Sequence, residues 1–375
     1  MAFPSPDSLL SASRDHSVRV WRRTQTTPPA FEASITTQGH DYINSLTFIR
    51  PSPSFPDGLI ASGGKEAIVE IKKPTSTPDE NADRLLIGHS HNICALDVSP
   101  KGSWLVSGSW DGYARVWNMS NWETELVLKH DNGGSVWCVL AFDEHTVITG
   151  CADQKIRIFD LRRGNAGEVE ARATISTPDV VRALAKLPTG LRGHPSGGEL
   201  ASASNDGIIR LWKLNGQQVG ELHGHESYIY SLGILPTGEI VSAGEDRTVR
   251  IWRGTQCVQT ITHPAISVWS VAVCADNGDI ATGASDNIVR VFTRSPERVA
   301  SPETVSQFDD SVKSSSIPQQ QLGGSINKEK LERPDWLQKH AGAKEGQVKM
   351  IREDNESIGA YQWSMSMWFP GILSI

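Results

Sequence analysis

The chain has 375 residues, of which 38% are hydrophobic and 21% are charged, as in an ordinary folded protein. Its formal net charge of −7 and the lack of any basic cluster argue against a nucleic-acid partner, which binds basic surfaces. No stretch approaches the roughly 20 apolar residues of a membrane span, and the first residues do not form a secretory signal.

The five cysteines are scattered, odd in number and without C-x-x-C spacing. This usage is typical of a reducing compartment, in which cysteine acts as a small apolar side chain. We therefore expect the protein in the cytoplasm and nucleus.

A thirteen-residue unit recurs seven times, beginning at residues 9, 59, 105, 147, 200, 240 and 280. Residues 105–117 read LVSGSWDGYARVW, and residues 240–252 read IVSAGEDRTVRIW. Each unit joins two short runs of apolar and small residues through a tight turn that usually contains Asp. A strand upstream, often introduced by His, and a strand downstream complete a four-stranded blade. The spacing predicts an all-β, seven-bladed propeller over residues 1–293, whose blades we number 1 to 7 in chain order.

These units resemble the WD40-repeat family, in which His, Ser or Thr, Asp and Trp of one blade form a buried hydrogen-bonded tetrad. The resemblance implies complete tetrads in blades 3 and 6, which would consist of His89, Ser107, Asp111 and Trp117, and of His225, Ser242, Asp246 and Trp252. Blades 1 and 5 match the motif in part. The unit at residues 59–71 is the most degenerate, and Lys65 stands there where Asp is expected.

Ser, His and Asp within one unit also suggest a nucleophilic triad. A catalytic constellation occurs once, however, whereas this set recurs in several blades, so the pattern favours a structural role. The pairs His89/His91 and His223/His225 have no third ligand nearby, which argues against a metal site. No phosphate-binding or nucleophile-elbow motif is present. The sequence therefore predicts no catalytic residue, no cofactor and no metal.

A propeller binds its partners at the face that carries its turns and at the mouth of its channel. Alternation along each first strand, together with the residues just before the turn acids, predicts a partner-binding ring on this top face: Arg14, Asn44, Trp110, Trp137, Arg182, Tyr230, Glu245 and Trp269. Trp, Tyr and Arg are typical of protein-binding hot spots. The alternative is that some of these aromatic side chains merely fill the channel.

The composition changes after Phe292. Residues 294–335 read as a mostly flexible linker, with one short helix opening at Ser301. Residues 336–364 resemble the N-terminal part of a PFU-type ubiquitin-binding module through motifs that include Gly346, Gln347, Tyr361, Gln362 and Trp363. Residues 365–375 no longer resemble this module, and we interpret them as an aberrant tail.

A propeller followed by this module resembles the family of phospholipase A-2-activating protein. The resemblance implies a non-catalytic adaptor that binds ubiquitin or ubiquitinated proteins in protein turnover and ubiquitin recycling. In full-length relatives, a further C-terminal domain recruits an AAA ATPase of the ubiquitin pathway, and we expect this domain to be absent here. The alternatives are a generic WD40 scaffold unrelated to ubiquitin, or an enzyme.

Only eight residues precede Leu9, too few for two strands. We therefore expect the first blade to lack its inner strand and the last blade its outer strand, as in an incomplete gene model.

Overall fold

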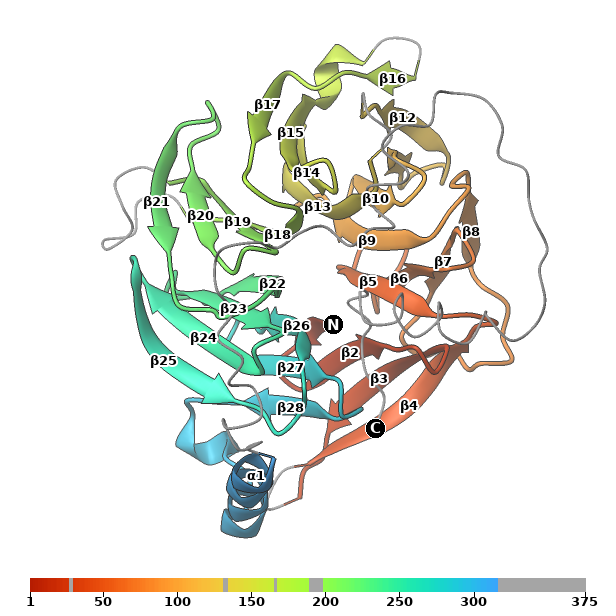
Figure 1. Ribbon diagram of the computed structural model, residues 1–375. Coiled ribbons are helices and arrows are strands. Elements are labelled where there is room, and N and C mark those ends of the chain that lie inside the picture. Colours follow the sequence, from red (N-terminus) through yellow and green to blue (C-terminus); the bar gives the residue numbers. More distant parts are fainter. Residues whose placement is uncertain (27–29, 131–133, 165–166, 189–197, 316–375) are drawn as a thin grey trace, which may run out of the picture. The chain divides into compact units, whose positions relative to one another are not determined.

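The computed structural model describes residues 1–26, 30–130, 134–164, 167–188 and 198–315. Within these residues, seven β-sheets stand around a common axis, each with its first strand innermost (Figure 1). The predicted seven-bladed propeller is thus confirmed. The residues assigned to a ubiquitin-binding module and to the tail, 336–375, lie outside the described residues.

The first four blades follow the chain in order. Blade 1 contains β1 (Ala2–Ser5), β2 (Ser8–Ala12), β3 (Ser17–Arg23) and β4 (Phe31–Gln38); blade 2 contains β5 (Ile43–Ile49), β6 (Leu59–Gly64), β7 (Ile68–Lys72) and β8 (Arg84–Ile87). Blade 3 contains β9 (Ile93–Val98), β10 (Trp104–Ser109), β11 (Ala114–Asn118) and β12 (Thr124–Leu128); blade 4 contains β13 (Val136–Asp143), β14 (Thr146–Cys151), β15 (Lys155–Asp160) and β17 (Ala173–Ser176). A 3₁₀ turn (Leu161–Arg163) leads to β16 (Glu168–Val169), which joins blade 3 by pairing in parallel with β12.

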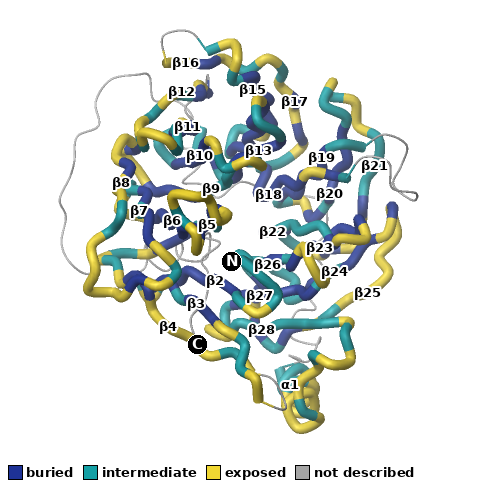
Figure 2. The backbone as a smooth tube through the Cα atoms, turned by 180° about the vertical axis from the view of Figure 1, so that it is seen from behind, coloured by how far each residue is buried: buried dark blue, intermediate teal, exposed yellow. Residues whose placement is uncertain are grey.

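The remaining blades complete the ring. Blade 5 contains β18 (Val181–Lys186), β19 (Leu200–Ser204), β20 (Ile209–Trp212) and β21 (Gln218–Leu222); blade 6 contains β22 (Ile229–Ile234), β23 (Ile240–Gly244), β24 (Thr248–Arg253) and β25 (Gln256–Thr262). Blade 7 contains β26 (Val268–Val273), β27 (Ile280–Ala284) and β28 (Val289–Phe292). Buried residues concentrate in the second and third strands of the blades, whereas outer strands such as β4 and β25 are mostly exposed (Figure 2).

The turn between the second and third strands has the same conformation in every blade. One residue with φ between 60° and 83° directly follows the turn acid: His16, Ala67, Gly112, Gln154, Gly207, Arg247 and Asn287. In blades 1, 3, 5, 6 and 7 the turn carboxylate accepts a hydrogen bond from the backbone N–H two residues on, for example Asp111 from Tyr113 at 2.9 Å. Asp recurs at this position because its short side chain closes the turn in this way.

The same turn corrects the alignment of blade 2. The residue with positive φ in this turn is Ala67, so the turn acid is Glu66. The repeat pattern alone aligns Lys65 with this position. Strand pairing agrees, because Ser62 lies opposite Glu70 just as Ser107 lies opposite Arg115 in blade 3. The repeat unit of blade 2 is therefore residues 60–72, one residue later than the sequence suggested. Lys72 consequently occupies the position at which blade 3 has its tetrad Trp.

Small residues in the second strands allow neighbouring blades to approach closely. A Cβ atom on Gly108 would lie 2.8 Å from methyl carbons of Val136 and Val139 in the first strand of blade 4. A Cβ atom on Gly150 would lie 2.6 Å from a methyl carbon of Val181 in the first strand of blade 5. Such distances are too short for a side chain, so glycine is required where the blades converge.

The two ends of the ring differ from the expectation. Blade 1 has its inner strand, because β1 pairs with β2 through Ala2↔Leu10 and Ser5↔Ser8, so the prediction for this blade is wrong. Four residues suffice for this short, irregular strand. Among the described residues blade 7 has three strands, as predicted, and β28 is its outermost.

Residues after β28 reinforce the closure between blades 7 and 1. A second 3₁₀ turn (Pro296–Arg298) places the Arg298 guanidinium on three acceptors. Nε donates to the Asp279 carboxylate at 2.9 Å, Nη1 to the Asp7 carboxylate at 3.1 Å, and Nη2 to the Pro6 carbonyl at 2.6 Å. Asp279 belongs to blade 7 and Pro6 and Asp7 to the β1–β2 turn, so one side chain joins the first and last blades.

The helix α1 (Pro302–Ser314) covers part of blade 7, and it begins where the sequence predicted a helix. Phe308 packs edge-on against Phe292 and His263, with ring centroids 5.7 and 6.1 Å apart. In the described part of the chain, no helix is long and apolar enough to cross a membrane.

Candidate functional site

The predicted ring residues lie at a recurring irregularity of the first strands. In blades 2 to 7 the register shifts at one residue, which forms a β-bulge: Asn44, Cys94, Trp137, Arg182, Tyr230 and Trp269. A bulge changes the direction of the side chain that it carries. The orientation of these residues therefore depends on the bulge and not on the simple alternation that the sequence analysis assumed.

The second set of ring residues is held beside the first by backbone hydrogen bonds. The residue before the turn acid donates its N–H to the residue that precedes the first strand. Trp110 donates to the Asn92 carbonyl at 3.0 Å, and Glu245 donates to the Tyr228 carbonyl at 2.8 Å. The same hydrogen bond recurs in blades 2 to 7, so each of these blades brings two side chains from distant parts of its unit to the mouth of the channel.

Blades 3, 4 and 5 share one cluster of ring residues. The rings of Trp110 and Trp137 meet edge to face, with centroids 5.5 Å apart. The Arg182 guanidinium lies 4.0 Å from the Trp137 ring centroid, close enough for a strong cation–π contact. Arg182 also donates from Nε to the Asn205 side chain at 2.9 Å. These contacts fix the orientation of the two indoles.

Blades 7, 1 and 2 share a second cluster. The Arg14 guanidinium lies 4.6 Å from the Trp269 ring centroid and 5.9 Å from that of Tyr42. Asn44 donates to the Asn92 side chain at 2.5 Å and so links blade 2 to blade 3. Tyr42 is 44% exposed and lies at the rim.

Burial divides the eight predicted residues into two groups. Asn44, Arg182 and Tyr230 are buried, at 8%, 6% and 6% exposure, and they fill and order the channel. The other five are accessible in part: Arg14, Trp110, Trp137, Glu245 and Trp269. Residues of the first group can act mainly by positioning those of the second.

Burial and neighbouring charges shift the pKa values of two buried ring residues, Tyr230 and Arg182. Burial raises the pKa of the Tyr230 hydroxyl, and so does the adjacent Glu245 carboxylate, which accepts its hydrogen bond at 2.8 Å. Burial lowers the pKa of the Arg182 guanidinium. Tyr230 therefore remains a neutral donor that holds Glu245 in place.

Sequence reasoning missed Tyr42, Asn92 and Tyr228, which line the same mouth. Each of them directly precedes the buried residue that begins the first strand, and therefore lies two residues before the bulge. The signal was available, because Tyr228 and Tyr42 are aromatic residues at equivalent places in two units. Tyr228 packs against Tyr230 with ring centroids 6.5 Å apart.

The tetrads of blades 3 and 6 have nearly identical geometry. In blade 3, His89 Nδ1 lies 2.8 Å from the Asp111 carboxylate and Nε2 lies 2.7 Å from the Ser107 hydroxyl, which accepts the Trp117 indole N–H at 2.8 Å. In blade 6 the distances for His225, Asp246, Ser242 and Trp252 are 2.8, 2.7 and 2.8 Å. Ser107 and Ser242 are completely buried, so the sets fasten each blade and offer no accessible nucleophile.

The tetrad carboxylates are stabilised in their charged form. Burial alone raises the pKa of the Asp111 carboxyl, but hydrogen bonds from His89, Tyr113 and Ser90 outweigh it, and the net shift is downward. The same balance lowers the pKa of Asp246.

Blades 4 and 7 contain partial sets in which Phe replaces Trp. His130 Nε2 lies 2.9 Å from the Thr149 hydroxyl. Both ring nitrogens of His263 are buried without a hydrogen-bond partner among the described residues. Burial, with nearby Arg290, lowers the pKa of His263 to about 4. A neutral imidazole without a hydrogen-bond partner among the described residues thus packs against the rings of Phe292 and Phe308.

This histidine makes stability depend on pH in a predictable direction. An unfolded His titrates near pH 6.5, so protonation favours the unfolded chain as the pH falls from about 6.5 to about 4. We expect His263→Phe to raise the melting temperature at pH 5 more than at pH 7. Thermal unfolding of both proteins at the two pH values measures this difference.

Comparison with the wild-type chain is needed because other groups titrate in the same interval. Burial lowers the pKa of His130 to about 4, which adds to the acid sensitivity. Burial raises the pKa of Asp97 to about 6, which acts in the opposite direction. Both persist in the variant, so an unchanged pH dependence after His263→Phe contradicts the assignment.

The histidine pairs considered as metal ligands serve other contacts. His89 and His225 belong to tetrads, His91 packs against Trp110, and His223 lies 2.9 Å from the Glu221 carboxylate. Among residues 1–315 as far as they are described, no three His, Cys, Asp or Glu side chains form a group suited to a metal ion.

Comparisons with known proteins agree with this architecture. A family model described as WD domain, G-beta repeat, matches residues 1–22, 82–118, 122–160, 177–213, 216–253 and 255–293. The match leaves out residues 23–81, which include the first three strands of the divergent blade 2.

Three relatives match nearly the whole chain. Ubiquitin homeostasis protein lub1 of Schizosaccharomyces pombe is 37% identical over 365 residues, covering 96% of this chain and 46% of its own. Phospholipase A-2-activating protein of Xenopus laevis is 35% identical, with 96% and 42% covered, and protein DOA1 of Saccharomyces cerevisiae is 34% identical, with 96% and 47% covered. The chain spans about half the length of these relatives.

A solved structure supports the same fold. The crystal structure of the WD40 beta propeller domain of Doa1 aligns with a TM-score of 0.69 and 34% sequence identity, covering 80% of this chain and 93% of that chain. The resemblance drawn from the sequence motifs is confirmed by these matches.

Proposed function

We propose that this chain, which belongs to the WD40-repeat family, is a non-catalytic adaptor that binds ubiquitin or ubiquitinated proteins at the top face of its propeller. The observation that carries the proposal is the 37% identity to ubiquitin homeostasis protein lub1, which covers 96% of this chain. That similarity extends through all the blades that build the ring.

The geometry of the ring supports a protein partner. Trp110, Trp137 and Trp269 are half-buried indoles whose orientation is fixed by neighbouring cations and rings. Aromatic side chains held in this way contribute much of the free energy at protein interfaces, because they lose little conformational freedom on binding.

A binding role also fits the chemistry of the buried sets. The Ser107 and Ser242 hydroxyls accept an indole N–H and contact an imidazole, so neither is placed to attack a substrate. The proposal therefore assigns the chain no reaction of its own. For the longer relatives it includes an AAA ATPase of the ubiquitin pathway as a second partner.

Titration of isotope-labelled ubiquitin with the full chain tests the proposal. We expect residue-specific shifts in the ubiquitin spectrum. We further expect Trp137→Ala to weaken binding at least tenfold, because it removes a partly exposed indole and the platform on which Arg182 stacks.

Trp122→Ala provides the matched control. Trp122 lies in the turn between β11 and β12, where it packs against Phe55, away from the ring. Its loss leaves ubiquitin affinity unchanged if the ring is the site. If ubiquitin at millimolar concentration shows no shifts, this absence contradicts the proposed function. Equal effects of the two substitutions would mean that the binding site lies elsewhere.

A further inference from the structure

Blade 2 reverses a charge that the other blades share. At the position opposite the Ser or Thr of the second strand, six blades have arginine: Arg19, Arg115, Arg157, Arg210, Arg250 and Arg290. In five of these blades the arginine forms an ion pair with the turn Asp four residues before it. Blade 2 has Glu70 at this position and Glu66 at the turn, so two carboxylates stand where an ion pair is usual.

Blade 2 also lacks the bulk of a tetrad. Lys72 replaces the indole, and its ammonium turns away to donate to the Thr36 and Thr77 carbonyls at 3.2 and 3.4 Å. His40 uses its backbone N–H to bond the Glu66 carboxylate at 2.8 Å. The Ser62 hydroxyl consequently has neither of the partners that Ser107 has.

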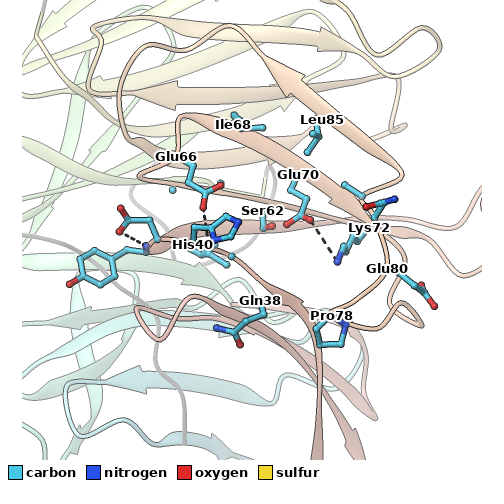
Figure 3. Close-up of a pocket in the computed structure, with 18 residues that line it drawn as sticks. Gln38, His40, Ser62, Glu66, Ile68, Glu70, Lys72, Pro78, Glu80 and Leu85 are labelled. Carbon is cyan, nitrogen blue, oxygen red and sulfur yellow. Dashed lines mark hydrogen bonds and ion pairs between the residues drawn. The ribbon is translucent and has the colours of Figure 1, made fainter.

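The Ser62 residue is 4% exposed, and no hydrogen bond to its hydroxyl is found among the described residues. Its oxygen is not among the fully buried, unpaired side-chain atoms, so it is accessible from the cavity that it lines. A hydroxyl in this position can form a hydrogen bond with a group that enters the cavity. Ser62 lines a cavity of about 310 Å³ between its own blade and the preceding one, together with His40, Glu66 and Glu70 (Figure 3).

The lining of this cavity is acidic with an aliphatic wall. Glu66, Glu70 and Glu80 supply carboxylates, and Ile68 and Leu85 supply methyl groups (Figure 3). Lys72 lies 3.8 Å from Glu70 and offsets part of this charge. Burial raises the pKa of the Glu70 carboxyl, Lys72 lowers it and Glu66 raises it, with a net upward shift. A cation in the cavity would relieve this repulsion.

We propose that the cavity beside Ser62, Glu66 and Glu70 binds an arginine side chain from a partner protein. The guanidinium of the partner supplies the positive charge that the other six blades obtain from an arginine of their own third strand. Its five N–H donors match two carboxylates and a hydroxyl, whereas a lysine ammonium has three donors and no plane. Its aliphatic stem lies along Ile68 and Leu85. This site goes beyond the proposed ubiquitin site, which lies at the channel mouth.

The test uses the full chain with labelled Ile and Leu methyl groups and the probe acetyl-arginine methylamide. We expect saturable shifts at the methyl groups of Ile68 and Leu85 at millimolar concentration. The citrulline analogue has the same shape without charge and should bind at least tenfold more weakly. Equal binding of the two probes, or shifts spread over all blades, overturns the proposal.

Two variants locate the site. Glu70→Gln should weaken arginine binding at least tenfold, whereas Glu125→Gln, at an exposed position of β12, should not change it. Glu70→Arg places an arginine opposite Ser62 and four residues after Glu66, as in the other blades, and should raise the melting temperature and abolish binding. A folded Glu70→Arg chain that still binds the probe contradicts the assignment. Neither variant should alter ubiquitin binding, so failure here and failure of the proposed function are distinguishable.

Discussion

Replacing Asp246 by alanine should lower the free energy of unfolding by about 4 kcal/mol. Its carboxylate accepts hydrogen bonds from His225 at 2.8 Å, from the Glu226 backbone at 3.1 Å, and from both donors of Thr248 at 3.1 and 2.7 Å. Except for the exposed Glu226 amide, these donors are partly or fully buried, so the variant leaves them unpaired. Urea unfolding followed by tryptophan fluorescence measures the loss, and Trp252 reports on the affected blade.

Asp206→Ala in blade 5 is the matched control. Asp206 occupies the same turn position, bonds the Ile208 backbone at 3.0 Å and pairs with Arg210 at 2.7 Å, but its blade has no tetrad His. We expect a loss of about 1 kcal/mol, the ordinary cost of an Asx turn. Losses of equal size would show that the carboxylate acts only through its turn, and that the tetrad adds little.

The architecture could be predicted from the sequence because the residues that define each blade lie close together in the chain. The residues of a tetrad lie within one repeat unit and its preceding loop, so their relation is local and recurs. His89, Ser107 and Trp117 could thus be placed together before any coordinates. The short inner strand β1 was missed because only Ala2–Ser5 form it, with an irregular pairing that no repeat pattern signals.

Blade 2 shows how a degenerate unit defeats local reasoning. Its run of small residues, Ala61 to Gly64, fits the pattern in two registers one residue apart. The positive φ of Ala67 and the pairing of Ser62 with Glu70 decide between them, and both are properties of the folded chain. The cavity could not be predicted either, because it depends on where the Lys72 side chain turns.

The candidate ring was predictable in position but not in exposure. The strand pattern located Trp137 and Arg182, yet their contact joins blades 4 and 5. Arg182 is buried beside Asn205 of its own blade and Tyr230 of blade 6. Sequence spacing specifies which side chains reach the mouth of the channel. Packing between blades decides which of them remain accessible to a partner.

Replacing Arg298 by alanine should lower the free energy of unfolding by about 3 kcal/mol. The guanidinium joins Asp279 of blade 7 to the β1–β2 turn of blade 1, and the Asp279 side chain is only 1% exposed. Without its cation, this carboxylate stays buried with Asn277 as its remaining side-chain donor. The variant should also exchange the backbone amides of β1 and β28 faster, because both border the junction. Hydrogen exchange followed by mass spectrometry measures that opening.

Arg294→Ala tests whether the stabilisation by Arg298 depends on its position between the two blades or only on its positive charge. Arg294 lies four residues earlier and donates to the Glu239 carboxylate at 2.9 Å, but Arg253 also binds Glu239, at 2.6 Å, so the carboxylate keeps a cation. We expect a loss below about 1 kcal/mol and no faster exchange in β1. Arg298→Lys keeps the charge but cannot reach three acceptors that lie in different directions, so it should recover less than half of the loss. Full recovery by lysine would mean that a general electrostatic attraction closes the ring, and that the three directed hydrogen bonds of Arg298 are dispensable.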